Sequence, residues 1–147
     1  PEQYTGAEIK LPADFDGHVV AAKFVSMGNP HYVIFVDRME GLDIARAGKL
    51  LERDEAFPER CNIEFAQLVG NDQIRTRVWE RGSGITQACG TGACATAAAA
   101  ASLGLASRHP AVLMDGGTLD IRWSANDDHI YMTGPAAFVF EGDIPMG

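Results

Sequence analysis

Cysteine is scarce in this sequence of 147 residues, which contains only Cys61, Cys89 and Cys94. An odd and sparse set excludes a framework of disulfides and favours reduced thiols. Basic residues are also few, because 12 Lys and Arg stand against 20 Asp and Glu, giving a formal net charge of -8. A phosphate backbone or an anionic bilayer would repel such a chain, so we expect neither nucleic acid nor a membrane as a partner.

Long apolar runs are lacking as well. No segment approaches the roughly 18 residues that a membrane-spanning helix needs, and residues 1–10 lack the basic and apolar regions of a signal peptide. We therefore expect a cytoplasmic protein. The composition, 46% hydrophobic and 22% charged, predicts a single domain over residues 1–147. The chain begins with Pro1 instead of methionine, which we interpret as a sign that it is a piece of a longer protein.

Turn residues divide the chain into short strands and two helices. Eight strands are expected, over residues 18–27, 32–36, 61–69, 74–80, 111–115, 118–123, 129–132 and 137–140. Apolar residues at helical spacing after Asp43 predict a short helix over residues 42–54.

The second helix is expected over residues 88–104, where alanine dominates and charge is absent. Alanine is the strongest helix former, and a helix with so little charge must be covered on nearly all sides. Its small side chains let surrounding strands approach closely. We therefore predict an α+β fold in which a mostly antiparallel sheet of about eight strands is rolled around this central helix.

Cys89 directly precedes the glycine-rich start of this helix, Gly90-Thr91-Gly92. Amides in the first turn of a helix carry positive partial charge, which suits a carboxylate or phosphate. The same field favours the thiolate form of Cys89. The other interpretation is that the glycines only permit a tight turn and that Cys89 is a small buried apolar residue. Cys94 lies five positions later, about 7.5 Å along the helix and about 140° around it, so we expect it to point into the core.

The sequence lacks the residues that a nucleotide-binding loop or a metal site would need. The segment lacks the Gly-Lys-Ser/Thr ending of a nucleotide-binding P-loop. The spacing of Cys89 and Cys94 does not suit structural zinc, and the histidines are scattered, so no metal is expected. Those histidines are His18, His31, His109 and His129.

Two long motifs resemble those of the diaminopimelate epimerase family. They are Glu80-Arg81-Gly82-x-Gly84-x-Thr86-x-Ala88-Cys89-Gly90-Thr91-Gly92-Ala93 and Met27-Gly28-Asn29-Pro30-His31-x-Val33. Three shorter matches are Phe57-Pro58-x-x-x-Asn62-Ile63-x-Phe65, Gly116-Gly117-x-Leu119 and Met132-Thr133-Gly134-Pro135. The resemblance therefore covers essentially the whole chain.

The resemblance implies a two-domain enzyme of pseudo-symmetric halves that interconverts L,L- and meso-diaminopimelate without pyridoxal phosphate or another cofactor. This chain resembles the C-terminal half, so the expected partners are the substrate and an N-terminal domain with its own catalytic cysteine; a homodimer stays open. Inverting a carbon requires an acid and a base on opposite faces of the substrate. Cys89 supplies only one, and Cys61 faces away if its neighbour Asn62 faces the substrate. The isolated chain is therefore expected to be inactive.

Residue roles follow from the matching motif positions. By resemblance, Cys89 is a catalytic thiol assisted by Glu80 and His31 near the reacting amino group. Gly90 and Thr91 would hold the carboxylate at the reacting carbon. The residues that would bind the distal end of the substrate are Asn29, Asn62 and Arg81.

Each of these residues also has a simpler interpretation. Glu80 and Arg81 could form a surface ion pair, Asn29 could build a turn and His31 could be an ordinary core imidazole.

Three alternative functions fit part of this pattern. The proline racemase and hydroxyproline epimerase group also uses paired thiols, but the motifs around Glu80 and His31 favour a substrate with a second charged end. Phenazine-biosynthesis isomerases resemble this family in fold and lack the catalytic cysteines. A non-catalytic binding domain is the third alternative, and thiol labelling and turnover would distinguish it from an enzyme.

Overall fold

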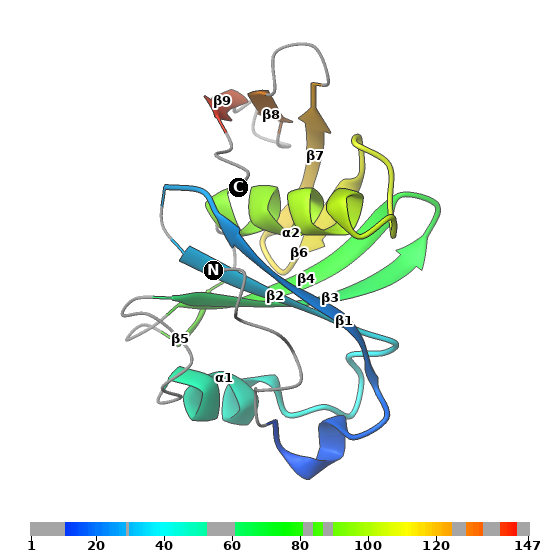
Figure 1. Ribbon diagram of the computed structural model, residues 1–147, viewed down its shortest axis with the longest axis vertical. Coiled ribbons are helices and arrows are strands. Elements are labelled where there is room, and N and C mark those ends of the chain that lie inside the picture. The colour runs from blue at the N-terminus through cyan, green and yellow to red at the C-terminus, as the bar shows by residue number, and fades with distance from the viewer. Residues whose placement is uncertain are drawn as a thin grey trace.

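The computed structural model describes residues 11–28, 30–52, 61–80, 84–86, 90–124, 129–133 and 139–143 (Figure 1). Three of the expected site residues, Asn29, Arg81 and Cys89, lie outside these ranges.

The described strands form one curled sheet. They are β1 (Val19–Ser26), β2 (Pro30–Val36), β3 (Asn62–Gly70), β4 (Gln73–Glu80), β5 (Gly84–Thr86), β6 (Ala111–Met114), β7 (Gly117–Trp123), β8 (His129–Thr133) and β9 (Val139–Asp143). Their order is β1-β2-β3-β4-β6-β7-β8-β9, with β5 paired to β4. The expected hairpins β1/β2, β3/β4 and β6/β7 are confirmed as antiparallel pairs.

The sheet differs from the expectation in two respects. The described residues form nine strands, because the three residues of β5 are too few to give a pattern in the sequence. The sheet is also mixed, because β2 pairs with β3 and β4 pairs with β6 in parallel. A parallel pair needs a crossover connection, usually a helix. The two helices lie in these two connections, so turn signals between neighbouring strands could not reveal the pairing.

The first crossover contains α1 (Ile44–Glu52), within the range expected for it. Asp43 stands just before the helix, and its Oδ1 accepts a hydrogen bond of 3.0 Å from the backbone N–H of Arg46. This is the usual N-cap contact, which satisfies one of the first amides of the helix. A short 3₁₀ turn, η2 (Ala13–Phe15), lies near it, and the Asp14 carboxylate accepts a hydrogen bond from the Asp43 N–H.

The second crossover contains α2 (Gly90–Ser102), and its central position is confirmed. Nine consecutive residues, from Gly92 to Ala100, are buried, so the helix has no exposed face along most of its length. It contacts β1, β2, β3 and β4 on one side and β6, β7 and β8 on the other (Figure 1). Neither helix in the described part of the chain is long and apolar enough to cross a membrane.

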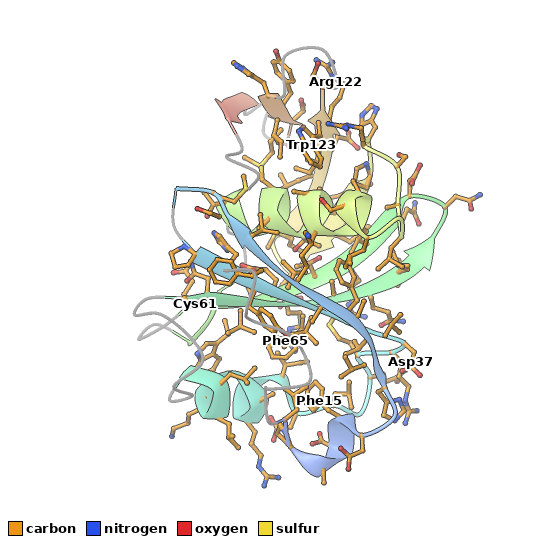
Figure 2. The ribbon with its side chains drawn as sticks, viewed as in Figure 1. Phe15, Asp37, Cys61, Phe65, Arg122 and Trp123 are labelled. Atoms are coloured by element: carbon orange, nitrogen blue, oxygen red, sulfur yellow. The ribbon has the colours of Figure 1, made fainter. Side chains whose placement is uncertain are left out.

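The two faces of β2, β3 and β4 bury different clusters. Side chains such as Val33, Phe35 and Val78 pack with α2, whereas Ile34 and Phe65 pack with α1. Neighbouring residues of a strand point to opposite faces, so each strand serves both clusters. Figure 2 shows Phe65 on the α1 side of the sheet, near Phe15. Their ring centroids are 5.8 Å apart.

The contact between α1 and β4 requires glycine at position 48. A Cβ atom added to Gly48 would lie 2.4 Å from Cδ2 of the Trp79 indole, which is far inside normal contact distance. Because Cδ2 belongs to a rigid and partly buried ring, the ring or the helix would have to move. The missing side chain thus allows α1 to approach the sheet.

We predict that Gly48→Ala destabilises the protein by about 1–3 kcal/mol, because overpacking exceeds the gain of about 1 kcal/mol in helix propensity. Lys49→Ala, at an exposed position of the same helix, is the matched control and should change the free energy of unfolding by less than about 0.5 kcal/mol. Urea titration followed by tryptophan fluorescence measures both. A Gly48→Ala variant as stable as the native chain would show that α1 can shift away from Trp79 at no cost.

Candidate functional site

Three of the predicted site residues meet at one edge of the sheet. His31 is the second residue of β2 and pairs in register with Asn62, the first residue of β3. In the neighbouring β3/β4 ladder, Ile63 pairs with Trp79, so one step outward brings Asn62 beside Glu80, the last residue of β4. The structure therefore brings His31, Asn62 and Glu80 together on three adjacent strands.

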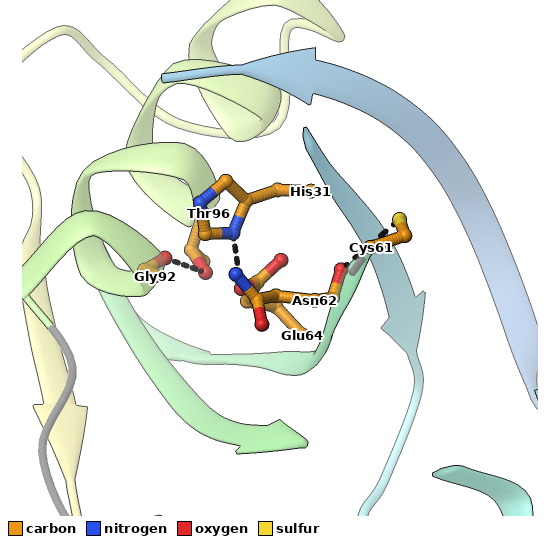
Figure 3. Close-up of polar contacts among 6 residues, drawn as sticks. All are labelled: His31, Cys61, Asn62, Glu64, Gly92 and Thr96. Carbon is orange, nitrogen blue, oxygen red and sulfur yellow. Dashed lines mark hydrogen bonds and ion pairs between the residues drawn. The ribbon is translucent and has the colours of Figure 1, made fainter. Parts of the chain in front are cut away.

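Strand alternation puts these three residues on the face that is covered by α2. His31 is two residues from Val33, and Glu80 is two residues from Val78, both of which pack with α2. Asn62 alternates with Cys61 and Ile63, which belong to the cluster on the α1 side. The thiol of Cys61 donates a hydrogen bond of 3.5 Å to the Asn62 carbonyl and lies on the opposite side from His31 (Figure 3). The prediction that Cys61 faces away from Asn62 is thus confirmed.

Both described thiols are buried. Cys61 belongs to the α1 cluster, and Cys94 lies inside the α2 cluster, as expected from its phase on the helix. Cys89 lies outside the described residues, so its catalytic role stays a prediction.

A buried carboxyl group lies behind the imidazole of His31. Oε2 of Glu64 is 2.6 Å from Nδ1 of His31, and both side chains have no exposed surface (Figure 3). The other carboxyl oxygen, Oε1, has no hydrogen-bond partner among the described residues. A buried charge without a partner is very unfavourable, so the contact with His31 is the main local compensation for Glu64.

The surroundings of Glu64 favour its neutral form. Burial raises the pKa of its carboxyl group, the hydrogen-bonded His31 opposes this rise, and the nearby charge of Glu80 adds to it. Helix α2, which covers this face, contains no Asp, Glu, Lys, Arg or His. At this edge of the sheet, the titratable side chains that the structure describes on the α2 side are therefore one imidazole and two carboxyl groups. Such a set can hold a proton or orient an ammonium group.

The start of α2 lies on the side of the molecule where β2 and β3 begin (Figure 1). The described helix begins at Gly90, followed by Thr91, and the anion binding expected at this start stays a prediction. A Cβ atom on Gly90 would lie 2.9 Å from the end of the Met132 side chain, so the helix start packs closely against β8. The positive end of the helix dipole is thereby held at the same end of the domain as His31 and Asn62.

The remaining predicted residues can be located only by their neighbours in the sequence. Asn29 directly precedes β2, Arg81 directly follows β4, and Cys89 directly precedes α2. Each is thus adjacent in sequence to an element end described above. Their contacts, including the suggested ion pair of Glu80 with Arg81, stay predictions.

Sequence reasoning missed Glu64. The signal was present, because a charged residue between the apolar Ile63 and Phe65 breaks the pattern of a buried strand. Glu64 also lies two positions after Asn62, which puts both on one face of β3. Among the residues that the structure describes, no three His, Cys, Asp or Glu side chains are grouped as a metal site would require.

Comparison with known proteins gives the same family as the motifs. The sequence profile described as "Diaminopimelate epimerase" matches residues 23–139. A diaminopimelate epimerase of Phocaeicola vulgatus is 52% identical over 142 residues, which are 97% of this chain and 51% of that protein. One of Bacteroides thetaiotaomicron is 58% identical over 120 residues, or 82% of this chain and 45% of that protein. The chain spans about half the length of these relatives.

Solved structures with a similar fold include phenazine biosynthesis proteins of the PhzF family. The protein of Bacillus anthracis aligns with a TM-score of 0.54 at 22% identity, covering 80% of this chain and 39% of its own. That of Enterococcus faecalis aligns with a TM-score of 0.57 at 15% identity, covering 78% and 42%. At this identity the likeness concerns the fold alone.

The family profile covers most of the chain, and the sequence relatives are about half identical to it. These matches favour the predicted family over the proline racemase alternative. The chain belongs to the diaminopimelate epimerase family.

Proposed function

We propose that this domain is one half of an epimerase that interconverts L,L- and meso-diaminopimelate without pyridoxal phosphate. The observation that carries the proposal is the convergence of His31, Asn62 and Glu80 at one sheet edge, on the face covered by α2. The helix start that directly follows Cys89 lies on the same side of the molecule (Figure 1). We infer diaminopimelate as the substrate because the chain belongs to the diaminopimelate epimerase family.

The second half would supply the opposite face of the active site. Epimerisation removes the proton of the α-carbon on one face and adds a proton on the other, so two groups must flank the carbon. Both described thiols are buried, and Cys61 lies on the far side of the sheet, so neither is a candidate for the second group. We infer that an N-terminal domain of the same enzyme, with a similar rolled sheet around a helix, carries the second catalytic cysteine.

Cys89 is the thiol that this half contributes. In one direction its thiolate takes the α-proton as the C–H bond breaks, and the electron pair left on carbon is delocalised into the adjacent carboxylate. In the other direction its thiol returns a proton to the carbon. Amides at the start of α2, at Gly90 and Thr91, would bind that carboxylate and stabilise its increased charge. This electrostatic help is the reason that we propose no cofactor as an electron sink.

The sheet edge would bind the rest of the substrate. Glu80 and His31 would orient the α-amino group and the thiol, while Asn29, Asn62 and Arg81 would hold the distal amino-acid end. An Arg side chain suits the distal carboxylate, because its planar guanidinium can form two parallel hydrogen bonds with a carboxylate. We also propose that the complete enzyme is cytoplasmic.

We predict that the chain alone does not epimerise diaminopimelate and that adding the separately produced N-terminal half restores turnover. In the reconstituted enzyme, Cys89→Ala should abolish turnover and leave the unfolding midpoint unchanged. Cys61→Ala is a control for loss of a thiol, since that side chain lies on the α1 face. Incorporation of deuterium from solvent at the α-carbon measures turnover. Comparable exchange by the chain alone, or by the Cys89→Ala enzyme, would contradict the two-thiol mechanism.

We predict that iodoacetamide alkylates Cys89 faster than the other two thiols at neutral pH. Cys61 is 3% exposed and Cys94 has no exposed surface, so both should react only when the chain opens. Peptide mapping after brief treatment measures the three rates. Modification of Cys94 first would mean that Cys89 is not the activated thiol of this domain.

A further inference from the structure

We propose that Glu64 is a positioning residue that fixes the orientation and tautomer of His31 for the epimerisation reaction. The role in the reaction rests on the function proposed above, whereas the effect on the imidazole does not. The motifs assign Glu64 neither to substrate binding nor to catalysis.

The register explains why Glu64 stands behind His31 instead of beside the substrate. On the parallel strands β2 and β3, His31 pairs with Asn62 and Val33 pairs with Glu64. Glu64 is therefore one same-face position farther into the sheet than Asn62. Its Oε2 reaches back to Nδ1 of His31 at 2.6 Å, a short distance for a bond between nitrogen and oxygen. The carboxyl group thus holds the ring from the interior.

The two nitrogens of an imidazole ring differ in role once one of them is engaged. A carboxyl group bound to Nδ1 selects the protonation state of that nitrogen and directs Nε2 away from the carboxyl group. Since Glu64 lies toward the interior, Nε2 of His31 is the nitrogen directed away from it. A fixed ring orientation is what a proton-transfer or substrate-orienting group requires.

The surroundings give Glu64 no other described partner that could replace His31. Oε1 is unpaired among the described residues, and α2 carries no charged residue over this face. Among the described residues, the charge of Glu80 on β4 acts on Glu64, and Cys94 on α2 lies in the buried cluster on the same side of the sheet. Glu80 repels a second negative charge, and the Cys94 thiol is only a weak hydrogen-bond donor. Loss of the carboxyl group should therefore act on His31 above all.

A buried pair of this kind could also serve stability alone, so the test must follow the imidazole itself. We propose Glu64→Gln, which keeps the size and one hydrogen-bonding oxygen but removes the ionisable group. Thr76→Val is the matched control, because Thr76 is buried on the same sheet face, one strand away, and its hydroxyl has no partner among the described residues. All variants are made in the full-length enzyme that contains this domain.

Two measurements are combined. The ¹⁵N shifts of the His31 ring nitrogens report the tautomer, and kcat and KM for diaminopimelate report the reaction. We expect Glu64→Gln to shift both ring-nitrogen resonances and to lower kcat by about 10- to 100-fold, the range found when the partner of a metal-binding histidine is removed. Thr76→Val should change neither. In a His31→Asn background, Glu64→Gln should cause no further loss, because it acts through the missing ring.

The inference about Glu64 and the proposed function can fail independently of each other. Unchanged ring-nitrogen shifts in Glu64→Gln would overturn the inference, even if the variant is less stable. A full loss of kcat that adds to that of His31→Asn would also overturn it and would make Glu64 act independently. If the native full-length enzyme does not epimerise diaminopimelate, the proposed function fails, while the ring-nitrogen shifts still decide whether Glu64 fixes His31.

Discussion

The burial of an alanine helix inside a curled sheet is the constraint on which this domain depends. From Gly92 to Ala100 the side chains of α2 are buried, and the helix is contacted by β1–β4 on one side and by β6–β8 on the other. Methyl groups let the strands come close enough to enclose it, whereas larger side chains would force them apart. The helix also has no charged residue that would require a route to solvent. Its start is therefore held at one end of the domain.

The chemistry of the site is a consequence of this enclosure. Strands β2, β3 and β4 turn alternate residues toward α2, and at their shared edge these residues are polar instead of apolar: His31, Asn62 and Glu80. The same alternation separates Cys61 from them and buries Glu64 behind His31. A low-dielectric helix above this edge strengthens each electrostatic interaction beneath it.

Local patterns in the sequence predicted the elements well and their pairing less well. The alanine run predicted α2, and the turn at residues 70–72 predicted the β3/β4 hairpin, because both signals lie within a few neighbouring residues. The parallel pairs β2/β3 and β4/β6 depend on contacts across the helical crossovers, and the three-residue β5 has too little sequence to show a period. The motifs selected His31, Asn62 and Glu80. They did not select Glu64, because its role depends on the register between two strands that are far apart in the chain.

We propose that the start of α2, which directly follows Cys89 in the sequence, binds the carboxylate of the substrate. The most direct test is to titrate the chain with diaminopimelate, and separately with sulfate, while following backbone amide shifts. We expect weak binding in which the amides of Gly90, Thr91 and Gly92 shift first, and we expect Thr91→Pro to remove this response by deleting one donor. Shifts that cluster instead at arginines, such as Arg108 and Arg122, would show that the start of α2 is not the binding site.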